Sequence, residues 1–359
     1  MRYKLLGNTG LKVSELCLGA MTFGSQEDWC TDATESRKMF DAFVQQGGNF
    51  IDTANIYTGG ESEKLVGEFV ASDRDRFVVA SKYTHAMPSR KDPNAGGNHR
   101  KNLVQSLDAS LKRLKLDYLD LYWVHVWDFA TPVEEVMRAL DDAVSAGKIL
   151  YTGFSDTPAW ISARANTMAE ARGWTPISAL QLEYSLLERS IERELMPMAK
   201  AMDIAITAWS PLGGGVLSGK YSRSANQDSS QAGESKRLDS VSFRQLDDWS
   251  IGVAQCVDAI ADSINNDRGK DQQISSAQVA LAWVRQQGCI PIIGARTLTQ
   301  LEDNMASLNL TLSDQQMQQL NQASSIKAGH PYDLMQSDLV RALSTAGMAD
   351  KIDNHRFPF

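Results

Sequence analysis

The sequence is poor in cysteine, has no excess of basic residues and contains no long apolar run. Its 4 cysteines form no C-x-x-C pair, which disfavours a disulfide framework and favours a reducing compartment, with the cytoplasm as the expected location. The formal net charge of -8 argues against nucleic acid as the main partner, because phosphate binding needs a basic surface. No apolar run is long enough to cross a bilayer, so neither a membrane span nor a secretory signal is expected.

Two common site motifs are also missing. The 5 histidines show no paired spacing such as H-E-x-x-H, so no metal site is predicted. No G-x-G-x-x-G motif follows a predicted strand and opens a helix. The glycine-rich stretch 213–219 comes nearest, but its spacing is wrong for a dinucleotide fold of the Rossmann type.

Short apolar runs alternate with longer amphipathic stretches along most of the 359 residues. The runs predicted to be strands are 13–18, 50–51, 77–80, 119–124, 149–153, 179–182, 204–209 and 290–293. The helical patterns between them are 35–46, 62–70, 101–114, 132–146, 159–172, 192–201 and 276–287. This alternation implies parallel strands, and the number of units favours a closed (β/α)8 TIM barrel over a doubly wound sheet.

The whole chain, 1–359, is predicted to be one barrel domain with a core at about 5–310 and a C-terminal helix and tail at 311–359. Runs at 3–6 and 11–13 predict a small β-hairpin that caps one end of the barrel. An extra helix is predicted at 246–264. Three further segments read as additions to the barrel, namely 83–99, 214–239 and 325–359.

Four chemically compatible residues stand at or just beyond consecutive strand ends, where the catalytic residues of such barrels lie. They are Asp52, Tyr57, Lys82 and His125. A nearby lysine favours the phenolate of a tyrosine and is expected to lower its pKa, while a carboxylate keeps the lysine charged. A histidine can hydrogen-bond a substrate oxygen. Each residue alone could instead be a helix cap, a solvated lysine, a packed aromatic or a core histidine, so the joint placement carries the interpretation.

The stretch GGNFIDTANIY at 47–57, which runs on to GESE at 60–63, resembles the signature of the aldo-keto reductase superfamily. ASK at 80–82 and His125 fit the same family, and the likeness extends from about residue 5 to 309. With SPL at 210–212, the chain is similar to the bacterial branch shared with the potassium-channel β subunits. The resemblance implies a catalytic tetrad, with Tyr57 as the general acid in a reversible, NADPH-dependent reduction of an aldehyde or ketone.

The loops after the seventh and eighth strands are the predicted cofactor site. Trp209 could stack on a nicotinamide ring or simply belong to the core, and Lys220 could offset phosphate charge. Arg296 and free N–H groups at the next helix start suit a phosphate, and the family places the 2′-phosphate of NADPH there. The family has Asn where this chain has Asp156, which can accept but not donate a hydrogen bond when ionised. The predicted cofactor contacts are Gly19, Ala20, Met21, Asp52, Ser155, Asp156, Gln181, Trp209, Ser210, Pro211, Leu212, Gly213, Gly215, Leu217, Gly219, Lys220, Gly294, Arg296, Gln300, Asp303 and Asn304.

The substrate is expected to be a small carbonyl compound, which the sequence does not specify further. The predicted substrate pocket holds Tyr57, His125, Trp29, Tyr83 and Trp127, although each aromatic residue could equally be ordinary packing. Two other functions stay open: a cofactor-binding, redox-sensing module like the channel β subunits, and a barrel isomerase or lyase without nicotinamide. A homo-oligomer is compatible with the sequence but not indicated by it.

Overall fold

Eight parallel strands close into a barrel in the computed structural model, which describes residues 1–25, 29–223, 246–266, 268–269 and 272–353. The barrel strands are β3 (Cys17–Gly19), β4 (Phe50–Asp52), β5 (Val78–Tyr83), β6 (Leu119–Val124), β7 (Ile149–Ser155), β8 (Ile177–Glu183), β9 (Ala205–Trp209) and β10 (Ile290–Ile293). Each pairs with the next, and β10 pairs with both β9 and β3 to complete the ring. The predicted (β/α)8 barrel is therefore confirmed.

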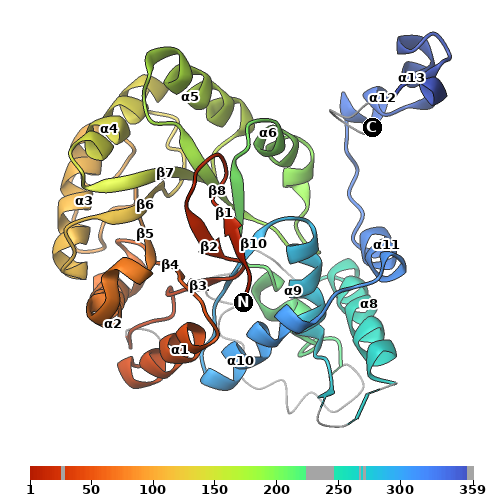
Figure 1. Cartoon of the computed structure of the whole chain (residues 1–359), viewed down its shortest axis with the longest axis horizontal. Coiled ribbons are helices and arrows are strands. Elements are labelled where there is room, and N and C mark those ends of the chain that lie inside the picture. The colour runs from red at the N-terminus through yellow and green to blue at the C-terminus, as the bar shows by residue number, and fades with distance from the viewer. Residues whose placement is uncertain (26–28, 224–245, 267, 270–271, 354–359) are drawn as a thin grey trace.

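Helices surround the ring of strands on its outside (Figure 1). Between successive strands, and after the last, lie α1 (Ala33–Gln45), α2 (Glu61–Val70), α3 (Arg100–Leu114), α4 (Val133–Ser145), α5 (Ala159–Arg172), α6 (Leu195–Ala201), α9 (Ser276–Gln286) and α10 (Leu298–Ala306). The extra helix predicted at 246–264 is α8 (Asp248–Asn265), which begins with a capping box at Asp247 and Ser250. Most of the predicted addition at 214–239 lies outside the described residues.

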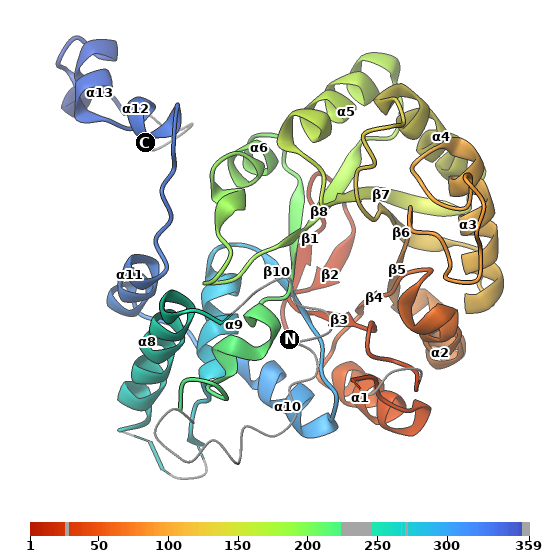
Figure 2. The same cartoon turned by 180° about the vertical axis from the view of Figure 1, so that it is seen from behind.

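The first predicted strand, 13–18, is divided in the structure. Its start belongs to β2 (Lys12–Ser14), which pairs antiparallel with β1 (Tyr3–Leu5), and its end is β3. Between the two, the backbone turns because the Ser14 hydroxyl donates to the carbonyl of Leu16, and the N–H of Glu15 donates to the carbonyl of Arg2. The hairpin lies across the ring of strands in the view of Figure 1 and behind it in Figure 2.

The hairpin closes the N-terminal end of the barrel. Leu6 and Val13 are fully buried in a cluster with side chains from inside the barrel, including Phe50 and Trp123. Lys4 also reaches the carbonyl of Gly288, just before β10. Because one end is filled in this way, the C-terminal ends of the strands form the open end, where barrel enzymes carry their sites.

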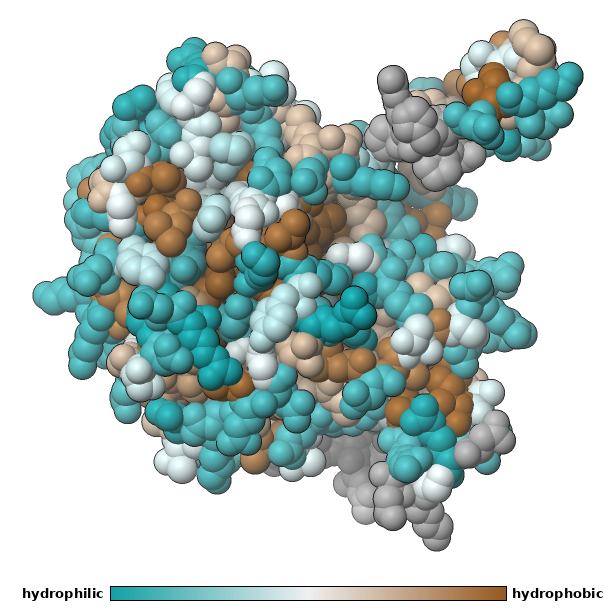
Figure 3. Space-filling model, viewed as in Figure 1, coloured by the Kyte–Doolittle hydropathy of each residue, from teal (hydrophilic) through white to brown (hydrophobic). Residues whose placement is uncertain are grey.

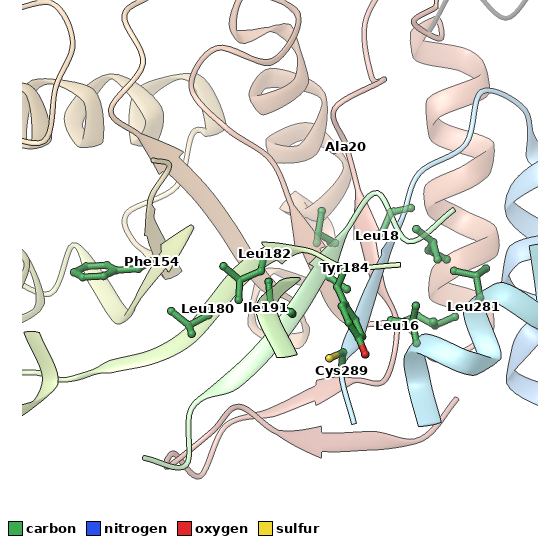
Figure 4. Close-up of a cluster of buried hydrophobic side chains, with 14 of the residues drawn as sticks. Leu16, Leu18, Ala20, Phe154, Leu180, Leu182, Tyr184, Ile191, Leu281 and Cys289 are labelled. Carbon is green, nitrogen blue, oxygen red and sulfur yellow. The ribbon is translucent and has the colours of Figure 1, made fainter. Parts of the chain in front are cut away.

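A second, larger cluster fills the layer between the strands and the helices. Figure 4 shows part of it, with Leu180 and Leu182 of β8 and Leu281 of α9 among the buried side chains. Burying such side chains contributes about 1.5–3 kcal/mol each. The alternation of side chains along each strand thus separates this outer layer from the barrel interior.

The chain leaves the barrel after α11 (Asp314–Ala323) and continues into α12 (Tyr332–Met335) and α13 (Asp338–Ser344), which lie apart from the barrel (Figures 1 and 2). The side chains of Leu339 and Leu343 are 64% and 73% exposed. Apolar residues are also visible on this segment in Figure 3. No helix among the described residues is long and apolar enough to cross a membrane.

Candidate active site

The four predicted catalytic residues meet at the open end of the barrel. Asp52 ends β4, Lys82 lies in β5 and His125 directly follows β6. The ammonium of Lys82, which is fully buried, forms an ion pair with the Asp52 carboxylate and lies 3.0 Å from the Tyr57 hydroxyl. The rings of Tyr57 and His125 stand edge to face, with centroids 5.8 Å apart.

The second oxygen of Asp52 is held by two neutral donors. The indole N–H of Trp123 lies 3.0 Å from it and the amide nitrogen of Gln181 lies 2.9 Å from it. The Trp123 ring fits across the barrel because residue 153 is glycine: a Cβ there would come within 2.3 Å of the ring. The buried carboxylate therefore has partners for both oxygens, as its burial requires.

The buried charges set the protonation of the lysine and the tyrosine. Burial disfavours the ammonium, but Asp52 and Tyr57 outweigh it and raise the pKa of Lys82 above its ordinary value. Burial also raises the pKa of Tyr57 above its usual value, against the opposing effect of Lys82. The expected lowering of the Tyr57 pKa is thus not confirmed, because desolvation exceeds the attraction of the ammonium. At neutral pH Tyr57 carries its proton.

His125 is neutral at the same pH. Burial, followed by the positive charge of Lys82, holds the pKa of His125 well below its ordinary value. Its Nδ1 is buried and has no hydrogen-bond partner among the described residues. An unsatisfied acceptor is better tolerated than an unsatisfied N–H, so the proton is expected on Nε2.

A cavity of about 430 Å³ opens above these residues. It is lined by Gly19, Met21, Thr22, Asp52, Ile56, Tyr57, His85, His125, Ser155, Asp156, Gln181, Glu183, Trp209, Ser210, Gly214, Ile292 and Gly294. Polar groups thus converge on one concave and partly apolar space, which is typical of a site for a small molecule.

A second cavity, of about 300 Å³, adjoins the first and shares four lining residues with it, namely Ser210, Gly214, Ile292 and Gly294. Its remaining polar lining includes Ser218, Lys220, Tyr221, Arg296, Gln300, Asp303 and Asn304. The two cavities are therefore neighbours, with Asp52, Tyr57 and His125 lining the first and the basic side chains of Lys220 and Arg296 lining the second.

Residues 15–325 match the sequence model of the aldo/keto reductase family. The chain belongs to this family. It is 37% identical to norsolorinic acid reductase of Aspergillus flavus over 345 residues, which cover 92% of this chain and 83% of that protein. It is 33% identical to a putative aryl-alcohol dehydrogenase of Saccharomyces cerevisiae over 350 residues, which cover 94% of this chain and 90% of the relative. Both relatives are fungal and do not bear on the likeness to the bacterial branch.

Most of the predicted cofactor residues of this aldo/keto reductase line one of the two cavities, but four do not. Ala20 and Leu217 are fully buried in the outer core. Gly213 packs against Leu187, and Gly219 lies between Ser276 and Asp258. These four residues pack against the protein beneath the loops and do not face either cavity. Pro211, Leu212 and Asp303 line the second cavity. Both carboxylate oxygens of Asp303, however, already accept hydrogen bonds, from Ser275 and Gln278.

A separate prediction concerns the start of α10, where free N–H groups were expected. The N–H of Leu298 donates to the Glu35 carboxylate at 2.8 Å, and that of Gln300 donates to the hydroxyl of the cap residue Thr297. The Arg296 N–H donates in turn to the side chain of Gln300. Because α1 packs against α10 and supplies Glu35, phosphate binding here would depend more on the Arg296 side chain than on these two N–H groups.

Three predicted substrate-pocket aromatics do not line the cavity. Tyr83 is fully buried in the outer core, stacked on Tyr122 with ring centroids 5.4 Å apart. Trp127 is also buried there, packed against Phe154. Trp29 is partly exposed and lies outside the lining of both cavities. Tyr57 and His125 do line the first cavity, and their place in a substrate pocket stays a prediction. The sequence did not point to His85 and Glu183 in this cavity or to Tyr221 in the second.

Asp156, the position that departs from the family pattern, accepts a hydrogen bond of 3.1 Å from the indole N–H of Trp209. The carboxyl is accessible from the cavity, yet the protein around it removes much of its water. This desolvation raises the pKa of Asp156 to about 6, against the opposing effect of the Trp209 hydrogen bond. Asp156 has φ 41°, a left-handed conformation that aspartate tolerates better than most residues. The carboxylate is therefore held at the cavity wall with its charge disfavoured.

Replacing Asp156 with asparagine should stabilise the protein more at pH 7 than at pH 4. The folded pKa of about 6 lies above the ordinary value of 3.8, so the wild type loses stability as the pH rises from about 4 to about 6. Access from the cavity weakens the effect, and we expect a gain of about 1–2 °C in melting temperature at pH 7. Thermal unfolding of both proteins at the two pH values tests it. An equal difference at both would show that Asp156 is not perturbed.

Proposed function

We propose that this protein reduces an aldehyde or ketone to the alcohol with NADPH, and catalyses the reverse oxidation. The observation that carries the proposal is the contact of one buried ammonium, that of Lys82, with both Asp52 and the Tyr57 hydroxyl at the floor of a cavity. Family membership supports the reaction class, and the names of the relatives, a reductase and an aryl-alcohol dehydrogenase, agree with carbonyl–alcohol chemistry. A cytoplasmic location stays a prediction from the sequence.

The residues around the second cavity fit a phosphorylated dinucleotide. The backbone at Gly215 and Gly294 faces open space, because a Cβ at either position would meet no atom within 4 Å. The hydroxyl of Tyr221 is buried without a partner among the described residues, so a ligand oxygen could satisfy it. Arg296 would hold a phosphate, while Trp209, Ser155 and Asp156 would hold the nicotinamide end near the tetrad. When bound, the cofactor would supply the hydride.

The chain's own residues supply the proton and the orientation. Tyr57 donates its hydroxyl proton to the oxygen of the carbonyl as that oxygen gains negative charge. Lys82 stabilises the phenolate that remains, and Asp52 keeps the lysine charged and aimed. The Nε2–H of His125 donates a hydrogen bond to the same substrate oxygen and fixes the carbonyl against Tyr57.

Consumption of NADPH with a panel of aldehydes and ketones tests the proposed function. We expect turnover with at least one carbonyl substrate and formation of the corresponding alcohol. If NADPH binds but is consumed no faster than by the Tyr57→Phe variant with any member of the panel, the protein is a cofactor-binding module instead. If NADPH does not bind, the isomerase or lyase interpretation replaces both.

Replacing Arg296 with leucine should weaken NADPH binding by about 10–100-fold and leave NADH binding almost unchanged. A charge-assisted hydrogen bond contributes about 1.5–3 kcal/mol, and only NADPH carries the 2′-phosphate. The guanidinium of Arg296 forms no ion pair with any residue that the structure describes, so its removal strands no protein charge. Titration of the intrinsic tryptophan fluorescence with each cofactor measures the effect. Equal weakening of both cofactors would place the 2′-phosphate elsewhere.

A further inference from the structure

His85 lies on the wall of the first cavity, beside the tetrad. Its ring centroid is 4.5 Å from that of His125, and the two rings stand edge to face. Both imidazoles line the cavity together with Tyr57. His85 comes three residues after Lys82, beyond the end of β5, so the alternation of the strand does not predict its direction.

The backbone that carries His85 is strained and tightly held. Thr84, the preceding residue, has φ 99°, a conformation that a β-branched residue rarely adopts. Its carbonyl accepts the N–H of Gly97 at 2.8 Å, and its hydroxyl donates to Asn98 at 2.8 Å. The carbonyl of His85 accepts the side-chain amide of Asn55 at 3.0 Å. Strain of this kind persists only where the surroundings enforce it, and it concentrates at functional sites.

The imidazole of His85 is available to a ligand. Burial, followed by the charge of Lys82, lowers the pKa of His85, so the ring is neutral at pH 7. Neither ring nitrogen has a hydrogen-bond partner among the described residues. A neutral imidazole offers one donor and one acceptor, which together suit a hydroxyl group.

We propose that His85 binds a second oxygen of the substrate, so that the enzyme selects carbonyl compounds with a hydroxyl one or two carbons from the C=O group. This inference rests on the proposed function, in which His125 holds the reacting oxygen. Because the two rings are adjacent, a substrate with two oxygens a few bonds apart can bond both of them at once. Asp156 and Glu183 line the same cavity, so a neutral hydroxyl fits better than a carboxylate.

Two pairs of ketones of matched shape test the inference: hydroxyacetone against butanone, and 4-hydroxy-2-butanone against 2-pentanone. In each pair a hydroxyl replaces a methyl group. We would measure kcat and KM of the full-length protein with NADPH, and compare the preference for the hydroxy ketone among variants. The wild type, His85→Leu and His85→Asn are compared with Ile56→Val, a change elsewhere on the cavity wall. Dividing the preference of the wild type by that of a variant cancels the intrinsic difference in reactivity between the two ketones of a pair.

The wild type should prefer the hydroxy ketone of at least one pair, and His85→Leu should reduce that preference about tenfold, as expected for one hydrogen bond. The loss should fall on the hydroxy ketone alone, with butanone or 2-pentanone little changed. His85→Asn, which can still hydrogen-bond, should restore part of the preference, and Ile56→Val should keep it. NADPH binding by each variant shows that it is folded.

An unchanged preference in a folded His85→Leu variant would overturn the inference, as would equal losses on both ketones of a pair. Wild-type protein that turns over neither member of either pair would overturn it as well. Those outcomes leave the proposed function standing as long as another carbonyl in the wider panel is reduced. Only a failure across that whole panel would remove the proposed function itself.

Discussion

Tyr57→Phe should lower kcat for carbonyl reduction by about 10²–10⁴-fold, the range that a positioned general acid contributes. The substitution removes the hydroxyl that lies 3.0 Å from the Lys82 ammonium and keeps the ring that packs edge to face with His125. Cofactor affinity should change by no more than about twofold, because the predicted cofactor contacts lie on other side chains. Steady-state kinetics and fluorescence titration with NADPH together measure both effects.

The matched control is Tyr221→Phe, which also removes a buried tyrosine hydroxyl but does so in the second cavity. It should act mainly on cofactor affinity and leave kcat at saturating NADPH close to the wild-type value. The opposite pattern, with a small effect of Tyr57→Phe on kcat, would mean that another group donates the proton. His125 would then be the first alternative, although its lowered pKa leaves the ring without the second proton that an imidazolium would donate at neutral pH.

The meeting of Asp52, Tyr57, Lys82 and His125 could be predicted from the sequence because the ends of the strands can be located in it. Asp52, Lys82 and His125 each end or follow a short apolar run, and parallel strands bring their C-terminal ends to one face of a barrel. The barrel itself followed from the same alternation. The divided first strand did not, since its break depends on the hydrogen bonds of Glu15 with Arg2 and of Ser14 with Asn49, which lie far from them in the sequence.

The aromatic residues predicted for the substrate pocket show what strand ends alone do not predict. Tyr83 directly follows Lys82 in β5, and successive side chains of a strand point to opposite faces. Since Lys82 points into the barrel, Tyr83 must point into the helix layer, where it stacks on Tyr122. This error was avoidable. His85 was not predictable in this way, because its direction is set by a strained turn at Thr84 rather than by a periodic element.

Protonation states were the least predictable property. The sequence predicts that a lysine and a tyrosine meet, but the sign of the shift in the Tyr57 pKa depends on how completely both are buried. In the structure, desolvation exceeds the effect of the ammonium, and the pKa rises. For a proton donor this direction is useful, because the hydroxyl stays protonated until the substrate oxygen develops charge. In the proposed reaction, Lys82 would then stabilise the phenolate that forms.

Lys82→Met should reduce the free energy of unfolding by about 3–5 kcal/mol, besides abolishing most of the activity, because it leaves the buried Asp52 carboxylate without its cation. Trp123 and Gln181 would still donate to one carboxylate oxygen, but neither supplies a charge. Denaturant unfolding followed by tryptophan fluorescence measures the loss. A loss below about 1 kcal/mol would indicate that the site relaxes to admit water or a proton.

The double variant Lys82→Met/Asp52→Asn separates charge from packing. Removing the unpaired carboxylate should make the double variant more stable than Lys82→Met alone, since the stability effects of substitutions at two contacting residues do not add. Replacing a buried ion pair by uncharged groups is often nearly neutral for stability. A double variant that is stable yet inactive would mean that the pair is required for the chemistry at Tyr57 rather than for the fold. If the stability lost by the double variant instead equals the sum of the losses of Lys82→Met and Asp52→Asn, the pair is a structural contact that the active site uses.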